Sequence, residues 1–358
     1  MKGLTSLPLL PLIMLCAPHS SADLRSLNDA EMGQLRGQGG LTIELETALS
    51  IGEFSYKDEG YININNLKLT DTDGSALDNI TLTFDLAGED EVLARGFSDY
   101  AKYASAGLLD SSNADVADVI SKYTVLDGSG ALQGFGEKFN SGDMVLHIGP
   151  TSPNLDLSAS GDTLKQASNL SALNSSIDFK LTIDSIELAD STYTPGSAIP
   201  APNTTTMLSD ISMEGMLGPV DLIFRNNGNL KNTTLANGTS ISDSSLEIDA
   251  HFKITDLDFS WEVADIILLF NLAAVGIEDM RIHNERGADT LGHFGFASAT
   301  AKLASATTAS GQEGLAIYDV EFRADLDMPK VAIGGTSIGE VYFTDFVISN
   351  TSMVIYGH

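Results

Sequence analysis

The stretch "FTDFVI", residues 343–348, places an aspartate third in a hexamer that otherwise looks like a β-strand. Side chains alternate between the two faces of a strand, so a strand with one buried face has apolar residues two positions apart. Phe343 and Phe346 are three positions apart, and Ile348 then resumes the spacing of two. The pattern predicts a strand that bends or bulges at Asp345.

The same form, with Asp, Asn or Ser third, recurs along the chain. The other hexamers are "INNLKL" (64–69), "LDNITL" (77–82), "IDSIEL" (183–188), "LSDISM" (208–213), "ITDLDF" (254–259), "IEDMRI" (277–282) and "IYDVEF" (317–322). Several are separated by roughly two dozen residues or twice that number, the range of a long hairpin or of one coil of a β-solenoid. The hexamers therefore predict a repeated structural unit.

A short polar side chain at the third position has a physical reason. A bend leaves a backbone N–H unpaired, and we expect the Asp, Asn or Ser side chain to accept it. Ordinary strands that carry acidic residues by chance are the alternative. The predicted strand-corner residues are Asn66, Asn79, Ser185, Asp210, Asp256, Asp279, Asp319 and Asp345.

Strand signals dominate from Leu41 onward, in segments such as "LTIELETALSI" and "SLEIDAHFKITDLDF" that alternate apolar and polar residues. Residues 88–128 differ, because apolar spacings of three and four predict two inserted helices. The predicted fold is mostly β: an elongated antiparallel or solenoid-like architecture with a short helical insertion. We expect one β-rich domain over 41–358.

The chain begins with features of a secretory signal peptide. Lys2 precedes an apolar run, and small residues at Ser20 and Ala22 predict cleavage after residue 22. The only cysteine, Cys16, lies inside this segment, so the mature chain would have no disulfide. A short helix and a glycine hinge are predicted over 23–40. We expect an exported protein of the cell surface, the outer membrane or the extracellular space.

The charge balance limits the partners. Nineteen Lys and Arg residues stand against 49 Asp and Glu residues, a formal net charge of -30. Such a surface repels phosphate backbones, so we expect no nucleic-acid partner. The expected partners are further copies of the chain or other envelope proteins, with lipid as an alternative.

One motif has the residue pattern of a hydrolase nucleophile. "GTSIG" (335–339) matches a nucleophile elbow around Ser337, but an elbow needs a strand, a sharp turn and a helix. A strand pattern follows Ser337 instead. The sequence therefore predicts no catalytic residues and no enzymatic activity.

One loop has the composition of a cation site. Asp71, Asp73, Ser75 and Asp78 surround Gly74 and resemble the start of a calcium loop, although the glutamate that an EF-hand needs is absent. A plain turn between two strands is the alternative reading. No other cofactor is expected, and calcium is the one candidate.

The segment "LNDAEMGQLRGQGGLTIEL" resembles the start of a family of exported proteobacterial proteins of unknown function. The matching residues are Leu27, Asp29, Glu31, Gly37, Gln38 and Gly40, and the tail "IGEVYFTDFVISNTSMVIYGH" is similar to that family as well. Some members are described as Fil-type filament or pilus-assembly proteins. The resemblance implies a surface or outer-membrane role and no catalytic residues.

Three functions are compatible with these features. The one that the sequence favours is a structural component of a secreted or cell-surface fibre, pilus-like assembly or adhesive layer, and the other two are alternatives. The second is an envelope carrier that binds lipid or hydrocarbon in an apolar β-groove. The third is an outer-membrane β-barrel, for which regular strands with one wholly apolar face would be required.

Overall fold

The computed structural model describes residues 40–107, 109–150, 176–196, 204–226, 233–242, 244–262, 274–287 and 290–357. Residues 1–39 form one unit and residues 40–358 another, and the second unit is described by itself. The predicted signal peptide at 1–22 and the helix and hinge at 23–40, apart from Gly40, lie outside the described residues.

The unit is built from strands, and the prediction of a mostly β fold is confirmed. The longer strands are β1 (Leu41–Thr47), β2 (Leu49–Lys57), β3 (Tyr61–Thr70), β4 (Leu77–Leu86), β9 (Met144–Pro150), β10 (Ile177–Ala189), β11 (Thr204–Arg225), β14 (Ser245–Trp261), β17 (Ala297–Thr307), β18 (Glu313–Ile333) and β19 (Thr336–Ile355). The shorter ones are β5 (Glu91–Leu93), β6 (Thr124–Leu126), β7 (Leu132–Phe135), β8 (Glu137–Phe139), β12 (Thr233–Thr234), β13 (Ser240–Ile241), β15 (Val275–Glu278) and β16 (Arg281–His283).

One large antiparallel sheet holds most of these strands, and its order follows the chain. Within the described residues, the chain crosses the sheet eight times, and each crossing pairs with the one before it. We call these crossings pass 1 (β1 and β2), pass 2 (β3 and β4), pass 3 (β9 and β10), pass 4 (β11), pass 5 (β14), pass 6 (β15, β16 and β17), pass 7 (β18) and pass 8 (β19). The fold is a meander, the antiparallel form of the prediction.

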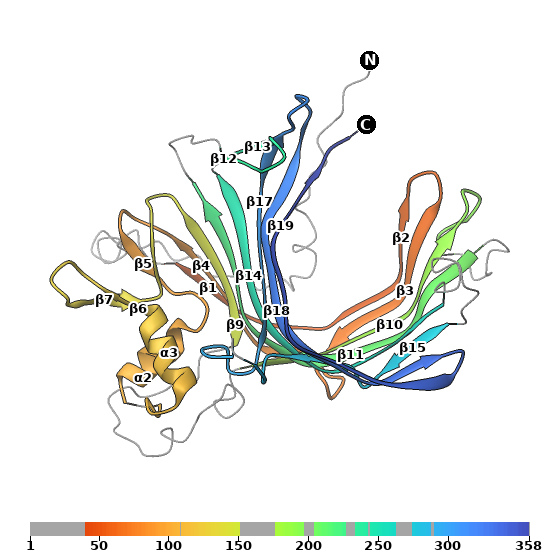
Figure 1. Cartoon of the computed structure of the whole chain (residues 1–358), viewed down its shortest axis with the longest axis horizontal. Coiled ribbons are helices and arrows are strands. Elements are labelled where there is room, and N and C mark those ends of the chain that lie inside the picture. Colours follow the sequence, from red (N-terminus) through yellow and green to blue (C-terminus); the bar gives the residue numbers. More distant parts are fainter. Residues whose placement is uncertain are drawn as a thin grey trace, which may run out of the picture. The chain divides into compact units, whose positions relative to one another are not determined.

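The sheet has two arms, which we name after the strand at their edge. The β1 arm contains β1, β4, β9 and β17, and the β2 arm contains β2, β3, β10 and β15. Strand β11 joins them, because it pairs with β10 along one half and with β9 along the other. Figure 1 shows the long strands bending as they run from one arm to the other.

The helices lie between β4 and β9, at α2 (Ser98–Ser105) and α3 (Ala114–Tyr123). Asn113 caps α3 by accepting the N–H groups of Asp115 and Val116 at 2.9 and 3.2 Å. Apolar residues of both helices form a buried cluster with Phe294 and Phe296, from the connection between β16 and β17. Both helices fall inside 88–128, and neither is long and apolar enough to span a membrane.

Candidate apolar binding face

Cross-strand registers show that the sheet of the β1 arm has two different faces. One row takes one residue from each of the eight passes, and all are apolar: Ile43, Leu82, Ile148, Val220, Ala250, Ala299, Phe322 and Ile348. The adjacent row is entirely polar: Thr42, Thr83, His147, Asp221, Asp249, Thr300 and Glu321. Adjacent residues of a strand point to opposite faces, so one face is apolar and the other polar.

The β2 arm repeats the division. One row is apolar and consists of Leu49, Leu69, Leu181, Met213 and Leu257. The adjacent row is polar and consists of Ser50, Lys68, Thr182, Ser212 and Asp258. We call the two sides the apolar face and the polar face.

The apolar sides of the two arms meet. Leu82 and Ile148 of the β1 arm pack in one cluster with Leu69, Phe179 and Leu217, where β10 and β4 converge on β11. Leu69 belongs to the apolar row of the β2 arm. The apolar face therefore continues from one arm into the other.

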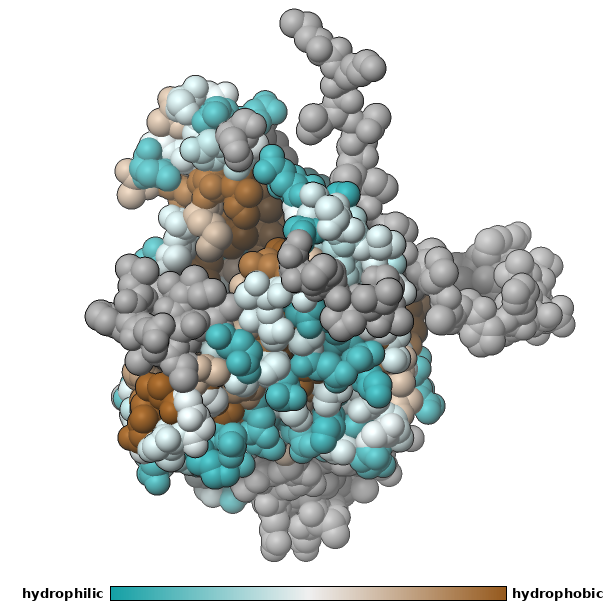
Figure 2. All heavy atoms as spheres, turned by 90° about the vertical axis from the view of Figure 1, so that its right-hand side faces the viewer, coloured by the Kyte–Doolittle hydropathy of each residue, from teal (hydrophilic) through white to brown (hydrophobic). Residues whose placement is uncertain are grey.

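Much of this face is open to solvent. Ile43, Leu49 and Ile348 expose 38%, 44% and 40% of their surface, and each is an apolar side chain that folding would ordinarily bury. The buried cluster of the helices contains no residue of the apolar rows, so the described helices cover the other side. Figure 2 shows apolar residues gathered in a recess of the surface. A contiguous exposed patch of this kind is typical of a binding surface.

The strand corners keep the apolar residues on one face through the bends. Ile317 and Phe322 are five positions apart, an odd number that would place them on opposite faces of a regular strand. Their partners on β17, Leu303 and Ala299, are four positions apart and share a face. The register shift at Asp319 restores the alternation, as a β-bulge does.

The predicted corner residues have mostly left-handed backbones. Of the eight, six have a positive φ between 50° and 58°: Asn66, Asn79, Asp210, Asp279, Asp319 and Asp345. Ser185 and Asp256 lie in β10 and β14 without a positive φ. Asn350, in β19, has a positive φ of 53° and was not predicted.

The expected role of the corner side chain differs from the observed contacts. The N–H of Asp345 donates to Oδ1 of Asp325 at 3.0 Å, and the N–H of Asp279 donates to Oδ1 of Asp258 at 2.8 Å. A carboxylate of a neighbouring strand thus accepts the freed donor. The corner residue itself supplies the left-handed backbone, which Asn and Asp adopt more readily than other side chains.

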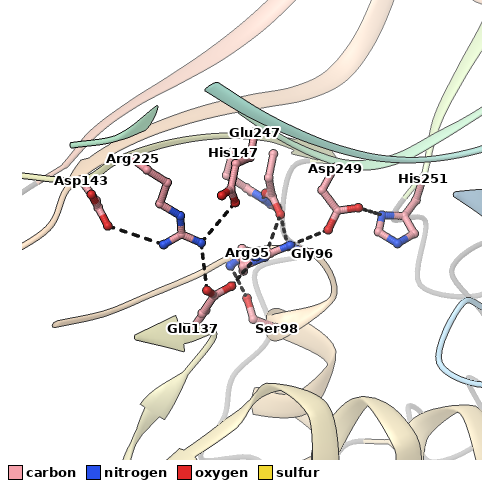
Figure 3. A network of polar contacts seen from close by, with 11 residues as sticks. Arg95, Gly96, Ser98, Glu137, Asp143, His147, Arg225, Glu247, Asp249 and His251 are labelled. Atoms are coloured by element: carbon pink, nitrogen blue, oxygen red, sulfur yellow. Dashed lines mark hydrogen bonds and ion pairs between the residues drawn. The ribbon is translucent and has the colours of Figure 1, made fainter. Parts of the chain in front are cut away.

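The polar face is held to the helical insertion by buried charges, drawn in Figure 3. Nη2 of Arg95 lies 2.5 Å from Asp249, and its Nε lies 3.5 Å from Asp221, which is 1% exposed. Arg95 also pairs with Glu137 of β8. Burial alone would lower the pKa of Arg95, but Asp249, Glu137 and Asp221 raise it above its ordinary value. Arg95 therefore stays charged and neutralises the carboxylates beneath the insertion.

A second arginine and a histidine extend this network. Arg225 pairs with Glu137 at 2.9 Å and with the fully buried Asp143 at 3.5 Å. Nδ1 of His147 lies 2.6 Å from Oδ1 of Asp221. Burial alone would lower the pKa of His147, and Asp221 outweighs burial and raises it. Sequence reasoning did not single out Arg95 or Arg225, because their partners are far away along the chain.

A polar recess lies beside this network, between α3 and the polar face. Lys122, His251, His293 and Arg323 line it together with Asp249 and Glu321. Burial, and then the nearby His251, lower the pKa of His293 to about 4. Acidic and basic side chains both line the recess, so its charge does not favour a ligand of either sign.

The predicted calcium residues form a turn. The N–H of Ser75 donates to Oδ1 of Asp73 at 2.8 Å, and the N–H of Asp71 donates to the carbonyl of Ser75 at 2.9 Å. Hydrogen bonds from the Ser75 side chain and backbone lower the pKa of Asp73. Asp78 lies in β4 and is exposed. Calcium binding here stays a prediction.

Three aspartates, from β14 and from the connection between β15 and β16, form a second acidic cluster. Carboxylate oxygens of Asp256, Asp258 and Asp279 lie within 4.8 Å of one another. Burial, followed by repulsion from Asp258 and Asp279, raises the pKa of Asp256. Asp256 and Asp279 were predicted as corners, but their proximity depends on strand register.

Comparisons with known proteins cover only the start of the chain. A family described as "Family of unknown function (DUF6160)" matches residues 1–88. This segment includes passes 1 and 2 of the meander. Searches of curated proteins and of solved structures each returned no match.

Proposed function

We propose that this chain binds a lipid-like molecule along its apolar face. The single observation that carries the proposal is the contrast between adjacent rows: eight apolar residues from eight passes beside seven polar ones. The apolar rows are aliphatic for the most part and contain no charged group. A long acyl or hydrocarbon chain matches such a surface, because its affinity comes from the apolar area removed from water.

The rest of the molecule is compatible with a carrier in an aqueous compartment. A net charge of -30 keeps the other surfaces hydrated and disfavours aggregation. The predicted signal peptide at 1–22 would export the chain, so we place the proposed ligand in the cell envelope or outside the cell. This role requires no catalytic residue.

A structural role in a surface fibre is the second candidate. The resemblance to exported proteins that include Fil-type members supports it, as do the two edges of the meander, which pair with no other described strand. An adhesive or fibre subunit, however, has no need for an extended apolar face on every pass. We therefore favour the carrier.

Two neighbouring substitutions test the proposal. Ile43 and Thr42 are both exposed and lie on opposite faces of β1. We expect I43E to weaken binding of a fluorescent long-chain fatty acid by about tenfold or more, because a charge must then be buried against the ligand. T42E should bind like the unsubstituted protein.

A direct measurement accompanies the titration. Protein purified under non-denaturing conditions should release acyl lipids into organic solvent, detectable by mass spectrometry. Protein that carries no lipid and binds the probe equally weakly in all three forms would rule the carrier out.

A further inference from the structure

Both edges of the meander lack a pairing partner among the residues that the structure describes. Among the described strands, β1 pairs only with β4, β2 only with β3, and β19 only with β18. Pass 1 covers residues 41–57 with a single break at Ala48, and β19 has 20 residues. Each edge therefore runs through both arms and presents a long series of free backbone donors and acceptors.

The directions of the edges are complementary. Successive passes are antiparallel, and their number is even. Pass 1 and pass 8 therefore run in opposite directions. A second copy in the same orientation, placed beside the first, would bring its pass 1 against pass 8 as an antiparallel neighbour, which continues the meander without any change of pattern.

The β19 edge has little of the usual protection by charge against such pairing, whereas pass 1 carries Glu44, Glu46, Glu53 and Lys57. Strand β19 contains no Lys, Arg or Pro, and its only charged residues are Glu340 and Asp345. Edge strands that stay unpaired commonly carry lysine or proline. Exposed apolar side chains stand at both edges instead, among them Leu41 and Ile43 on β1 and Ile348 and Ile355 on β19.

We propose that pass 8 of one copy pairs with pass 1 of the next, so that the chain assembles by edge-to-edge addition. The apolar row that begins at Ile43 ends at Ile348. In the assembly, Ile348 of one copy would be followed by Ile43 of the next, and the separate apolar faces would become one continuous face. The pairing itself does not depend on lipid binding.

Charge sets the conditions for assembly. Each copy carries a formal net charge of -30, so copies repel one another over a distance that salt shortens. We expect assembly to strengthen as salt or a divalent cation is added. The test is therefore made at near-physiological salt and repeated with calcium supplied and withheld.

Crosslinking between single cysteines tests the proposal. Cys16 is the only cysteine, so the C16S chain can carry one thiol at a chosen position. Delipidated I43C protein is mixed with I348C protein, and a short bismaleimide links thiols that lie side by side. M353C replaces I348C to detect a register shifted along β19.

The expected product is a mixed dimer of I43C with I348C or M353C, and a ladder of higher multimers for the I43C/I348C double variant. Because neighbouring thiols have a high effective concentration, the mixed dimer should exceed by about tenfold the product from S129C, in the exposed turn before β7.

Two results would overturn the proposal. One is a yield no higher than that of S129C under every salt condition. The other is a predominance of I348C joined to I348C, which would mean that β19 pairs with itself. Loss of lipid binding in dilute monomer would count against the carrier alone, because crosslinking is measured without lipid.

Discussion

The two faces of this sheet are formed by the same strands but differ in how far other elements cover them. Next to one another in β11, Ile223 is fully buried under β5 and β8, whereas Phe224 on the other face is 40% exposed. The polar face carries the buried charges and the packed insertion, and the apolar face carries exposed aliphatic side chains. The polar face therefore holds more of the stability, and the apolar face is available for binding.

The largest expected effect is on the polar face. Arg95→Ala would remove the closest cation of Asp249 and would leave Asp221 with His147 alone, and breaking a buried ion pair costs about 3–5 kcal/mol. Urea unfolding should show a large drop in the midpoint. Lys330→Ala is the matched control, because Lys330 and its partner Glu278 are both more than half exposed. Equal midpoints for the two variants would contradict the anchoring role.

A pair in β11 compares the faces directly. Ile223→Ala should destabilise the protein by about 2–5 kcal/mol, the usual cost of emptying a packed site. Phe224→Ala removes a larger side chain but should cost less, because that side chain already contacts water. The free energy of unfolding in urea checks the order. If Phe224→Ala cost more, a packed element would have to cover the apolar face.

Substitutions at the strand corners should change the free energy of unfolding by less, in a direction that the backbone conformation predicts. Asp319 has a φ of 50° and an exposed side chain. Asp319→Ala should cost about 1–2 kcal/mol because alanine disfavours the left-handed region. Asp319→Gly should cost less than Asp319→Ala, since glycine accepts this conformation. Thermal unfolding of both variants would show it, and a reversed order would mean that the carboxylate matters more than the backbone.

The last comparison is in pH dependence, where the pKa values of His147, in the polar face, and His293, in the connection between β16 and β17, are shifted in opposite directions. The raised pKa of His147 contributes stability below about pH 6.5, which is lost as the pH rises through the folded-state pKa. The lowered pKa of His293 contributes stability above about pH 6.5, which is lost as the pH falls toward about 4.

Urea midpoints over a pH series measure both effects. We expect His147→Gln to flatten the loss on the alkaline side and His293→Gln to flatten the loss on the acidic side. Unchanged slopes in both variants would contradict these assignments.

Local patterns in the sequence predicted much of the fold. The alternation of apolar and polar residues predicted strands, and that prediction is confirmed. Corner hexamers such as the one at Asp319 mark register shifts, and those from residue 183 onward fall in successive passes, so the short and the long intervals between them both correspond to one pass. These features are readable because strand alternation and the left-handed preference of Asp and Asn act over a few residues.

Long-range pairing decided the rest. Arg95 meets Asp249, 154 positions later, only because the insertion folds onto the polar face. Ile43 and Ile348 belong to one row only through six intervening strands. An alternating strand does not record which of its faces another element will cover, since that depends on distant segments of the chain. The sequence determined that each strand has an apolar side, and the tertiary structure decided that these sides join into one open face.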